Sequence, residues 1–142
     1  MSRNRSLRSI TAMVAMVGLL AGLPGAGATE CCDPASPFRA GEGYADVPAS
    51  CETIGQWVDQ APTVDARVSM TIRGALSAVE TDGALAYLIM CAQPGIQVMC
   101  VTYETNAMKP GDVVLFAGGY SRVGEKQVML DPCLASRKPA VE

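Results

Sequence analysis

The fold is decided by the segment ARVSMTIRG, residues 66–74. Apolar and polar side chains alternate along it, and this period of two is typical of a strand with one buried face. We therefore expect a half-buried strand with a polar outer face. Gly74 ends the segment with a residue that lacks a Cβ, which suits a strongly bent strand.

Four further strands are expected after this segment, separated by turns rich in glycine, proline and aspartate. They are expected at residues 84–91, 96–103, 113–117 and 127–130. Gly118 and Gly119 would let the fourth strand bend or bulge. Such a series predicts a mainly β fold, a small five-stranded Greek-key barrel of the OB-fold type, because closure removes exposed strand edges. A small β-sandwich is the alternative.

The first 28 residues have the features of a signal peptide. Residues 2–9 carry three arginines, residues 10–23 are apolar and uncharged, and Ala26-Gly27-Ala28 matches the cleavage pattern. A transmembrane anchor is the alternative, but the apolar run is shorter than the ~20 residues that span a bilayer. We expect cleavage and a periplasmic or secreted protein. Lipidation at Cys31 is not expected, because Glu30 does not fit a lipoprotein cleavage site.

Between the leader and the barrel lies a segment with little regular pattern. Ser50 is positioned to cap a short helix over residues 51–59, and Ile54, Trp57 and Val58 fall on one face of that helix. The chain is therefore divided into four segments: a signal peptide at 1–28, a Cys- and Pro-rich arm with a short helix at 29–65, an OB-fold barrel at 66–135 and a disordered tail at 136–142.

Composition argues against several classes of function. The chain contains no histidine, so it lacks the usual general base and the commonest metal ligand. Three of its eleven basic residues but none of its fourteen acids lie in the first 28, which leaves 8 basic and 14 acidic groups and a net charge of -6. Such a surface repels phosphates, so nucleic acid is not an expected partner. We expect a protein without catalytic activity, cofactor or bound metal.

Six cysteines follow the signal peptide: Cys31, Cys32, Cys51, Cys91, Cys100 and Cys133. An even number in a small exported chain indicates a disulfide framework, whose connectivity the spacing leaves open. A zinc site is the alternative, but the chain has no C-x-x-C pair and no histidine. We expect the adjacent Cys31 and Cys32 to bond to two different partners, because a bridge between neighbours strains the peptide that joins them.

Four motifs carry a family resemblance: Val68-x-Met70-x-Ile72-x-Gly74, Ile96-x-Val98-x-Cys100-x-Thr102, Lys109-Pro-Gly-Asp-Val-Val114 and Val128-x-Leu130-Asp-Pro-Cys133. On these motifs, residues 66–135 resemble the exported bacterial OB-fold domains of the tRNA_anti-like type. The resemblance implies the fold more than a function. It also implies a Cys100–Cys133 disulfide, because strands three and five are neighbours in that barrel. Cys91 would then pair with Cys51 or with one of the two N-terminal cysteines.

OB barrels bind ligands on the outer face of strands two and three and on the loops beside it. The resemblance places these side chains there: Arg73 at the end of strand one, Gln97, Met99 and Tyr103 on strand three, and Tyr120 and Arg122 in the loop between strands four and five. Tyr87 on strand two is a further candidate, and the pattern leaves open which way it faces. Tyrosine and arginine are residue types that anchor recognition surfaces. A solvated barrel with isolated surface aromatics is the alternative.

These features predict a binding or adaptor module that recognises a protein or small ligand on this face. Its oligomeric state is left open. One alternative is a structural subunit of an envelope or secreted assembly. Another is a copper carrier, since five methionines follow residue 28 and thioether sulfur suits Cu(I). Core packing is the simpler explanation of the methionines, and Met70 shares the parity of the buried face.

Overall fold

Six strands and one short helix follow one another along residues 31–137, the part of the chain that this computed structural model describes. They are β1 (Phe38–Ala40), α1 (Ile54–Asp59), β2 (Val68–Thr81), β3 (Ala86–Met90), β4 (Gln97–Thr102), β5 (Val113–Gly124) and β6 (Gln127–Arg137). The predicted signal peptide lies outside the described residues, as do residues 138–142 of the predicted tail.

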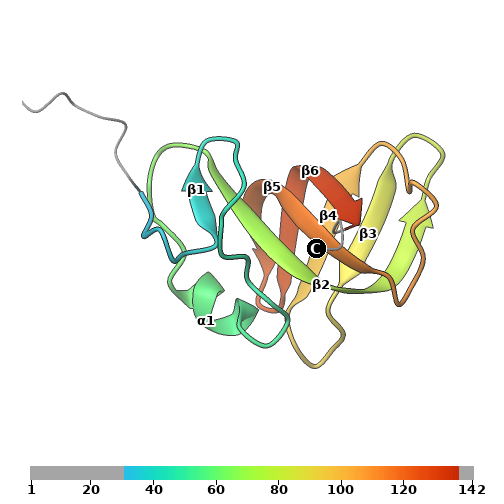
Figure 1. Cartoon of the computed structure of the whole chain (residues 1–142), viewed down its shortest axis with the longest axis horizontal. Helices are drawn as coiled ribbons and strands as arrows, with labels where there is room; N and C mark the ends of the chain where they lie inside the picture. Colours follow the sequence, from blue (N-terminus) through green and yellow to red (C-terminus); the bar gives the residue numbers. More distant parts are fainter. Residues whose placement is uncertain (1–30, 138–142) are drawn as a thin grey trace, which may run out of the picture.

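Five of these strands close into a barrel (Figure 1). They pair in the order β2-β3-β4-β6-β5, and β5 pairs back onto β2. Every pair is antiparallel except β4 with β6. A closed five-stranded Greek-key order of this kind is the OB-fold, so the predicted fold class is confirmed. The short strand β1 is an addition that pairs with the start of β2.

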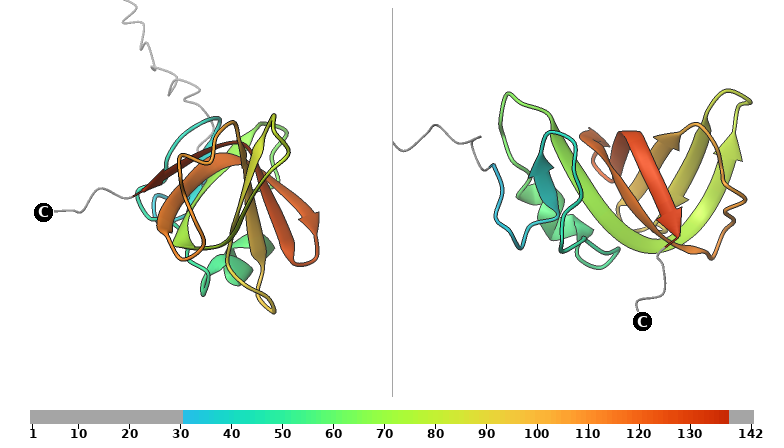
Figure 2. Two further views of the ribbon diagram at one scale, coloured as in Figure 1. Left: turned by 90° about the vertical axis from the view of Figure 1, so that its right-hand side faces the viewer. Right: turned by 45° about the horizontal axis from the view of Figure 1, so that its top comes forward.

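The strand β2 is longer than the sequence pattern predicted and connects the two ends of the molecule (Figures 1 and 2). Its first half pairs with β1 and β5, and its second half pairs with β3. Gly74 lies within the strand, where a Cβ would come within 3.0 Å of Cys51 Sγ and of Met90 Sδ. The absence of a side chain therefore lets a disulfide and a core side chain pack closely against the Gly74 Cα.

The polar face at the start of β2 is covered, which differs from the expected solvent-facing surface. Ser69 and Thr71 are only 2% and 1% exposed. The arm that precedes α1 packs over them: the Ser69 hydroxyl donates to the Gly41 carbonyl, and the Ala45 N–H donates to Thr71 Oγ1. Because the arm satisfies these hydroxyls, both faces of the strand are buried here.

The helix α1 begins later than predicted, at Ile54. Ser50 bonds to Thr53 in the turn that precedes the helix and does not cap it. The predicted apolar face is confirmed, since Ile54 and Val58 are buried and Trp57 packs half-buried against the core. Within residues 31–137, no helix has the length and apolar character needed to cross a membrane.

Two disulfides connect distant parts of the fold. Cys100 on β4 is joined to Cys133 on β6, the pair implied by the family resemblance. Cys51, just before α1, is joined to Cys91 after β3. In both, the Cα atoms lie 5.4 Å apart, a separation typical of disulfides.

The third disulfide joins Cys31 to Cys32, so the expectation of two different partners for them is wrong. The other four cysteines form the two disulfides described above, which leaves Cys31 and Cys32 to bond to each other. Both members pack half-buried against the core cluster. The vicinal disulfide therefore forms part of the apolar packing of the arm.

The last two strands also exceed their predicted lengths. β5 continues through Tyr120 and Arg122, which were expected in a loop. β6 continues past the predicted end at Leu130 to Arg137, which includes two residues assigned to the tail. The pairing slips between Gly118 and Tyr120, so extra β6 residues are accommodated as a bulge and the ladder resumes beyond it.

Candidate functional site

The seven predicted site residues occupy four separate places on the barrel. Gln97 and Met99 lie together on the outer side of β4, next to Ile89 of β3. They line a hollow of about 50 Å³ with Val123 and Gln127. This surface, the β3–β4 face, is where the resemblance placed ligand binding, but it contains only this small hollow.

Tyr87 lies on the same face and is engaged in a polar contact. Its hydroxyl donates to the Asp82 carboxylate at 2.8 Å. The backbone N–H groups of Leu85 and Ala84 also donate to that carboxylate. These three bonds hold the pKa of Asp82 below its usual value, and the same contact raises the pKa of Tyr87. Tyr87 therefore braces the turn between β2 and β3.

Three other predicted residues have structural partners elsewhere. Tyr120 packs edge-on against Phe38 with ring centroids 5.1 Å apart, and burial raises its pKa. Arg122 forms an ion pair with Asp59 at 3.7 Å. Arg73 lies beside the Cys51–Cys91 disulfide in a separate hollow. The structure does not bring these three together with Gln97 and Met99.

The seventh residue, Tyr103, lines an apolar groove of about 240 Å³ that lies farther along the outer side of β4, toward the end of that strand. We call it the β4–β6 groove because of where it forms. The parallel ladder between β4 and β6 runs from Gln97–Gln127 to Cys100–Leu130. Beyond that pair, no β4–β6 pairing is found within residues 31–137. The groove lies between the two strand ends.

The two walls of the groove are the continuing strands. Val101, Thr102 and Tyr103 form one wall, and residues 132–134 form the other. The Cys100–Cys133 disulfide ties the walls together where the ladder ends. The opening is therefore fixed by a covalent bond.

The floor of the groove consists of Ala117, Gly118 and Gly119 of β5. A Cβ on Gly118 would lie 2.5 Å from the Pro132 carbonyl oxygen and 2.9 Å from Cys133 Cα. Real Cβ atoms do not approach backbone so closely, so only glycine allows β5 and β6 to pack here. The same glycines leave the floor without projecting side chains.

Exposed apolar side chains surround this floor. Tyr103 is 80% exposed, Leu134 is 62% exposed and Tyr44, from the arm, is 52% exposed. Single exposed apolar residues are ordinary, but a cluster around a hollow marks an interaction site. The groove thus combines an apolar floor with a rim of large side chains available for contact.

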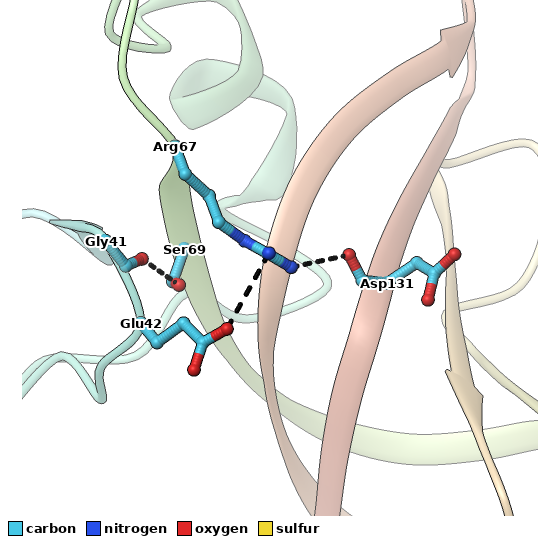
Figure 3. Close-up of polar contacts among 5 residues, drawn as sticks. All are labelled: Gly41, Glu42, Arg67, Ser69 and Asp131. Atoms are coloured by element: carbon cyan, nitrogen blue, oxygen red, sulfur yellow. Dashed lines mark hydrogen bonds and ion pairs between the residues drawn. The ribbon is translucent and has the colours of Figure 1, made fainter.

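A single arginine borders the apolar floor (Figure 3). Arg67 Nη2 donates to the Asp131 carbonyl at 3.1 Å, and Nη1 lies 3.6 Å from the Glu42 carboxylate. A Cβ on Gly119 would lie 2.7 Å from this guanidinium. Arg67 therefore lies across the Gly119 backbone and spans from the arm to β6.

Metal-ligating groups do not gather in the described residues. In residues 31–137, no three or more His, Cys, Asp or Glu side chains are grouped so that they could hold a metal ion. All six cysteines are in disulfides. Met99 and Met129 are neighbours in the β4–β6 register, which places two methionines side by side on the β3–β4 face.

No family model matches the chain, and no curated protein matches it. The crystal structure of the S. pombe Stn1–Ten1 complex is similar at 18% sequence identity and a TM-score of 0.38. The match covers 56% of this chain and 62% of that chain, so the similarity spans less than two thirds of either. The assignment of the OB-fold rests on the strand order. Fold and site together define a small, disulfide-bonded OB-fold protein with an apolar groove at the end of its parallel ladder.

The sequence interpretation found one residue of this groove, Tyr103, and missed the others. Tyr44 belongs to the arm, Arg67 was read as part of a generic polar face and Leu134 lay beyond the predicted end of the last strand. The available signal was the pair Gly118-Gly119, which was interpreted only as a bend or bulge in the strand. Two adjacent glycines in a strand also indicate a close backbone approach.

Proposed function

We propose that this chain is a non-catalytic binding module, acting in the periplasm or outside the cell, that holds an extended segment of a protein partner in the β4–β6 groove. The observation that carries this proposal is the end of the β4–β6 ladder at Cys100–Leu130, with both strands continuing on either side of an apolar floor.

A polypeptide suits this groove because the walls are strand edges. β6 pairs with β5 on one side from Cys133 to Arg137, and within residues 31–137 no strand pairs with its other side there. An added strand can bond to such an edge while its alternate side chains enter an apolar hollow. A volume of about 240 Å³ is below the ~300–1,000 Å³ of pockets for drug-sized ligands, and it fits one or two side chains.

The disulfides support the proposed compartment. Bonds such as Cys51–Cys91 and Cys100–Cys133 persist in oxidising environments and are rare in reducing ones. They also hold the two sides of the groove and the arm in place before a partner arrives. A site fixed in advance loses less conformational entropy on binding.

Site-specific photo-crosslinking tests which surface is used. A photoreactive benzoylphenylalanine replaces Tyr103 in the groove or, as the matched control, Tyr87 on the β3–β4 face, and each variant is produced and irradiated in host cells. We expect a discrete protein adduct from position 103, and none from position 87. The adduct should disappear when Leu134→Asp is added, because a charge then enters the apolar rim.

Other outcomes have defined meanings. An adduct from position 87 and none from position 103 would move the site to the β3–β4 face and overturn the groove. Adducts from neither position would overturn the binding function. An adduct made only of two copies of this chain would favour the alternative of a structural subunit in an assembly.

A further inference from the structure

We propose that the partner segment carries a carboxylate next to an apolar residue, and that this carboxylate replaces Glu42 on Arg67. The inference rests on the proposed function of the β4–β6 groove and adds the chemistry of its ligand. In this interpretation Glu42 occupies, in the free protein, the place of an acidic group of the partner.

Most of the hydrogen-bond donors of Arg67 are unused within residues 31–137. A guanidinium offers five N–H donors. Among the described residues, one hydrogen-bond acceptor is found for them, the Asp131 carbonyl. The Asp131 carboxylate points away from the guanidinium (Figure 3). Arg67 therefore presents most of its donors, and an uncompensated part of its charge, at the edge of the groove.

Glu42 is held only weakly by Arg67. Its carboxylate lies 3.6 Å from Arg67 Nη1, beyond the ~2.7–2.9 Å of a charge-assisted hydrogen bond. Its side chain is 76% exposed, and that of Arg67 is 46% exposed. Exposed ion pairs of this kind contribute little to stability. A carboxylate with better geometry can displace Glu42 at small cost.

The backbone next to Glu42 is fixed to the start of β2. The Gly41 N–H donates to the Arg67 carbonyl at 2.7 Å, and the Gly41 carbonyl accepts from the Ser69 hydroxyl. The base of the loop is thus fixed to β2, while the next side chain extends into solvent. Glu42 can leave Arg67 by a side-chain rotation, without movement of the arm.

The position of Arg67 beside the apolar floor decides which ligand chemistry the groove favours. Among residues 31–137, Arg67 and Glu42 are the charged side chains that line the groove, so Arg67 is its one cationic group there. The guanidinium lies over Gly119, which is part of the apolar floor. When a ligand group reaches Arg67, the adjacent part of the ligand therefore lies on the apolar floor. An Asp or Glu flanked by an apolar residue has the matching chemistry, and a planar fork can bind its carboxylate through two bonds.

A random heptapeptide library displayed on phage tests this, with the purified chain and its disulfides intact as the target. We expect selected peptides to contain an Asp or Glu beside an apolar residue. The same selection against Arg67→Gln should keep the apolar preference and lose the acidic one. Arg73→Gln is the matched control, because it removes an arginine of β2 that lies outside the groove, and it should select the same peptides as the native chain.

Calorimetric titration of the best selected peptide then measures the effect of each side chain. Arg67→Gln should weaken binding by about 10- to 100-fold, since hydrogen bonds to charged groups are lost. Arg67→Lys should recover only part of the loss, because an ammonium lacks the planar fork. Glu42→Gln should strengthen binding by about 2- to 5-fold, because the internal competitor is removed from a weak exposed pair.

The outcomes separate this inference from the proposed function. Apolar peptides without acidic enrichment, bound equally by Arg67→Gln, would overturn the carboxylate and leave the groove as a binding site. The double variant Tyr103→Ala with Leu134→Ser tests the groove itself. If the selected peptides bind it as tightly as they bind the native chain, both the carboxylate inference and the proposed groove are overturned. Weaker binding by Glu42→Gln would show that Glu42 contacts the ligand and does not compete with it, which also overturns the inference.

Discussion

The β3–β4 face and the β4–β6 groove belong to the same barrel but differ in how their backbone is used. On the face, Ile89, Met99 and Met129 stand on strands that are fully paired through the ladders on both sides of β4. At the groove, the β4–β6 ladder has ended. The backbone groups of the two walls therefore do not pair with each other. Their side chains are of similar polarity, so the difference lies in the pairing.

This difference explains why residue type was a poor guide to the site. Tyr87 and Arg122 have the side chains of a recognition surface but are engaged by Asp82 and Asp59. Tyr103 is of the same type and has no such partner among the described residues, because it follows the last paired residue of β4. The end of a ladder creates an opening that the surrounding side chains then line.

The largest effect is expected from the bridge that spans this opening. Replacing Cys100 and Cys133 with alanine removes a link between residues 33 apart in sequence, which should lower the free energy of unfolding by about 2–4 kcal/mol. Denaturant unfolding measures this change. Replacing Cys31 and Cys32 with alanine is the control and should cost much less, because a link between adjacent residues closes no loop. Equal losses in the two variants would contradict the role given to the Cys100–Cys133 bridge.

A smaller effect is expected from the floor of the groove. Gly118→Ala places a methyl group against the Pro132 carbonyl and the Cys133 backbone, so β5 and β6 must separate. Such overpacking should lower the free energy of unfolding by about 1–3 kcal/mol in thermal or denaturant unfolding. Gly124→Ala is a control on the same strand, where the nearest atom would be 3.5 Å away. A loss at Gly124 as large as that at Gly118 would contradict the close approach at the floor.

Most of the barrel followed from local patterns in the sequence. Local patterns placed β3 and β4 within two residues at both ends and the starts of the other three strands equally well, and the alternation in residues 66–74 identified Met70 and Ile72 as buried. What local patterns missed were the long ends of β2, β5 and β6. Residues such as Leu134 and Ser136 join a strand because β5 lies opposite them. Whether such residues belong to a strand depends on pairing with a segment that is distant in the sequence. A local stretch of sequence does not contain that information.

The site was less predictable for the same reason. Its residues come from the arm, β2, β4, β5 and β6, which only the folded chain brings together. Arg67 and Ser69 have the same alternating pattern, yet one spans the edge of the groove and the other bonds beneath the arm. Their roles depend on Glu42, Gly41 and Gly119, residues that lie more than twenty positions away in the chain.

The smallest effect is expected on the β3–β4 face, at the contact between Tyr87 and Asp82. The folded-state pKa of Asp82 lies below the unfolded value, so its stabilising contribution is complete above that unfolded value and is lost as the pH falls through the folded one. Tyr87→Phe removes one of three donors, so the pKa should rise toward its ordinary value while the bonds from Leu85 and Ala84 keep it depressed. NMR titration of the Asp82 carboxyl carbon measures this shift.

Tyr103→Phe is the matched control for that titration, because the Tyr103 hydroxyl makes no hydrogen bond within residues 31–137. The Asp82 pKa should stay the same in this variant, and the acid side of the stability profile should match that of the native chain. An unchanged Asp82 pKa in Tyr87→Phe would mean that Tyr87 is free for ligand contact. The β3–β4 face and the β4–β6 groove would then no longer differ in this respect, because each would present a tyrosine that is not engaged by another residue.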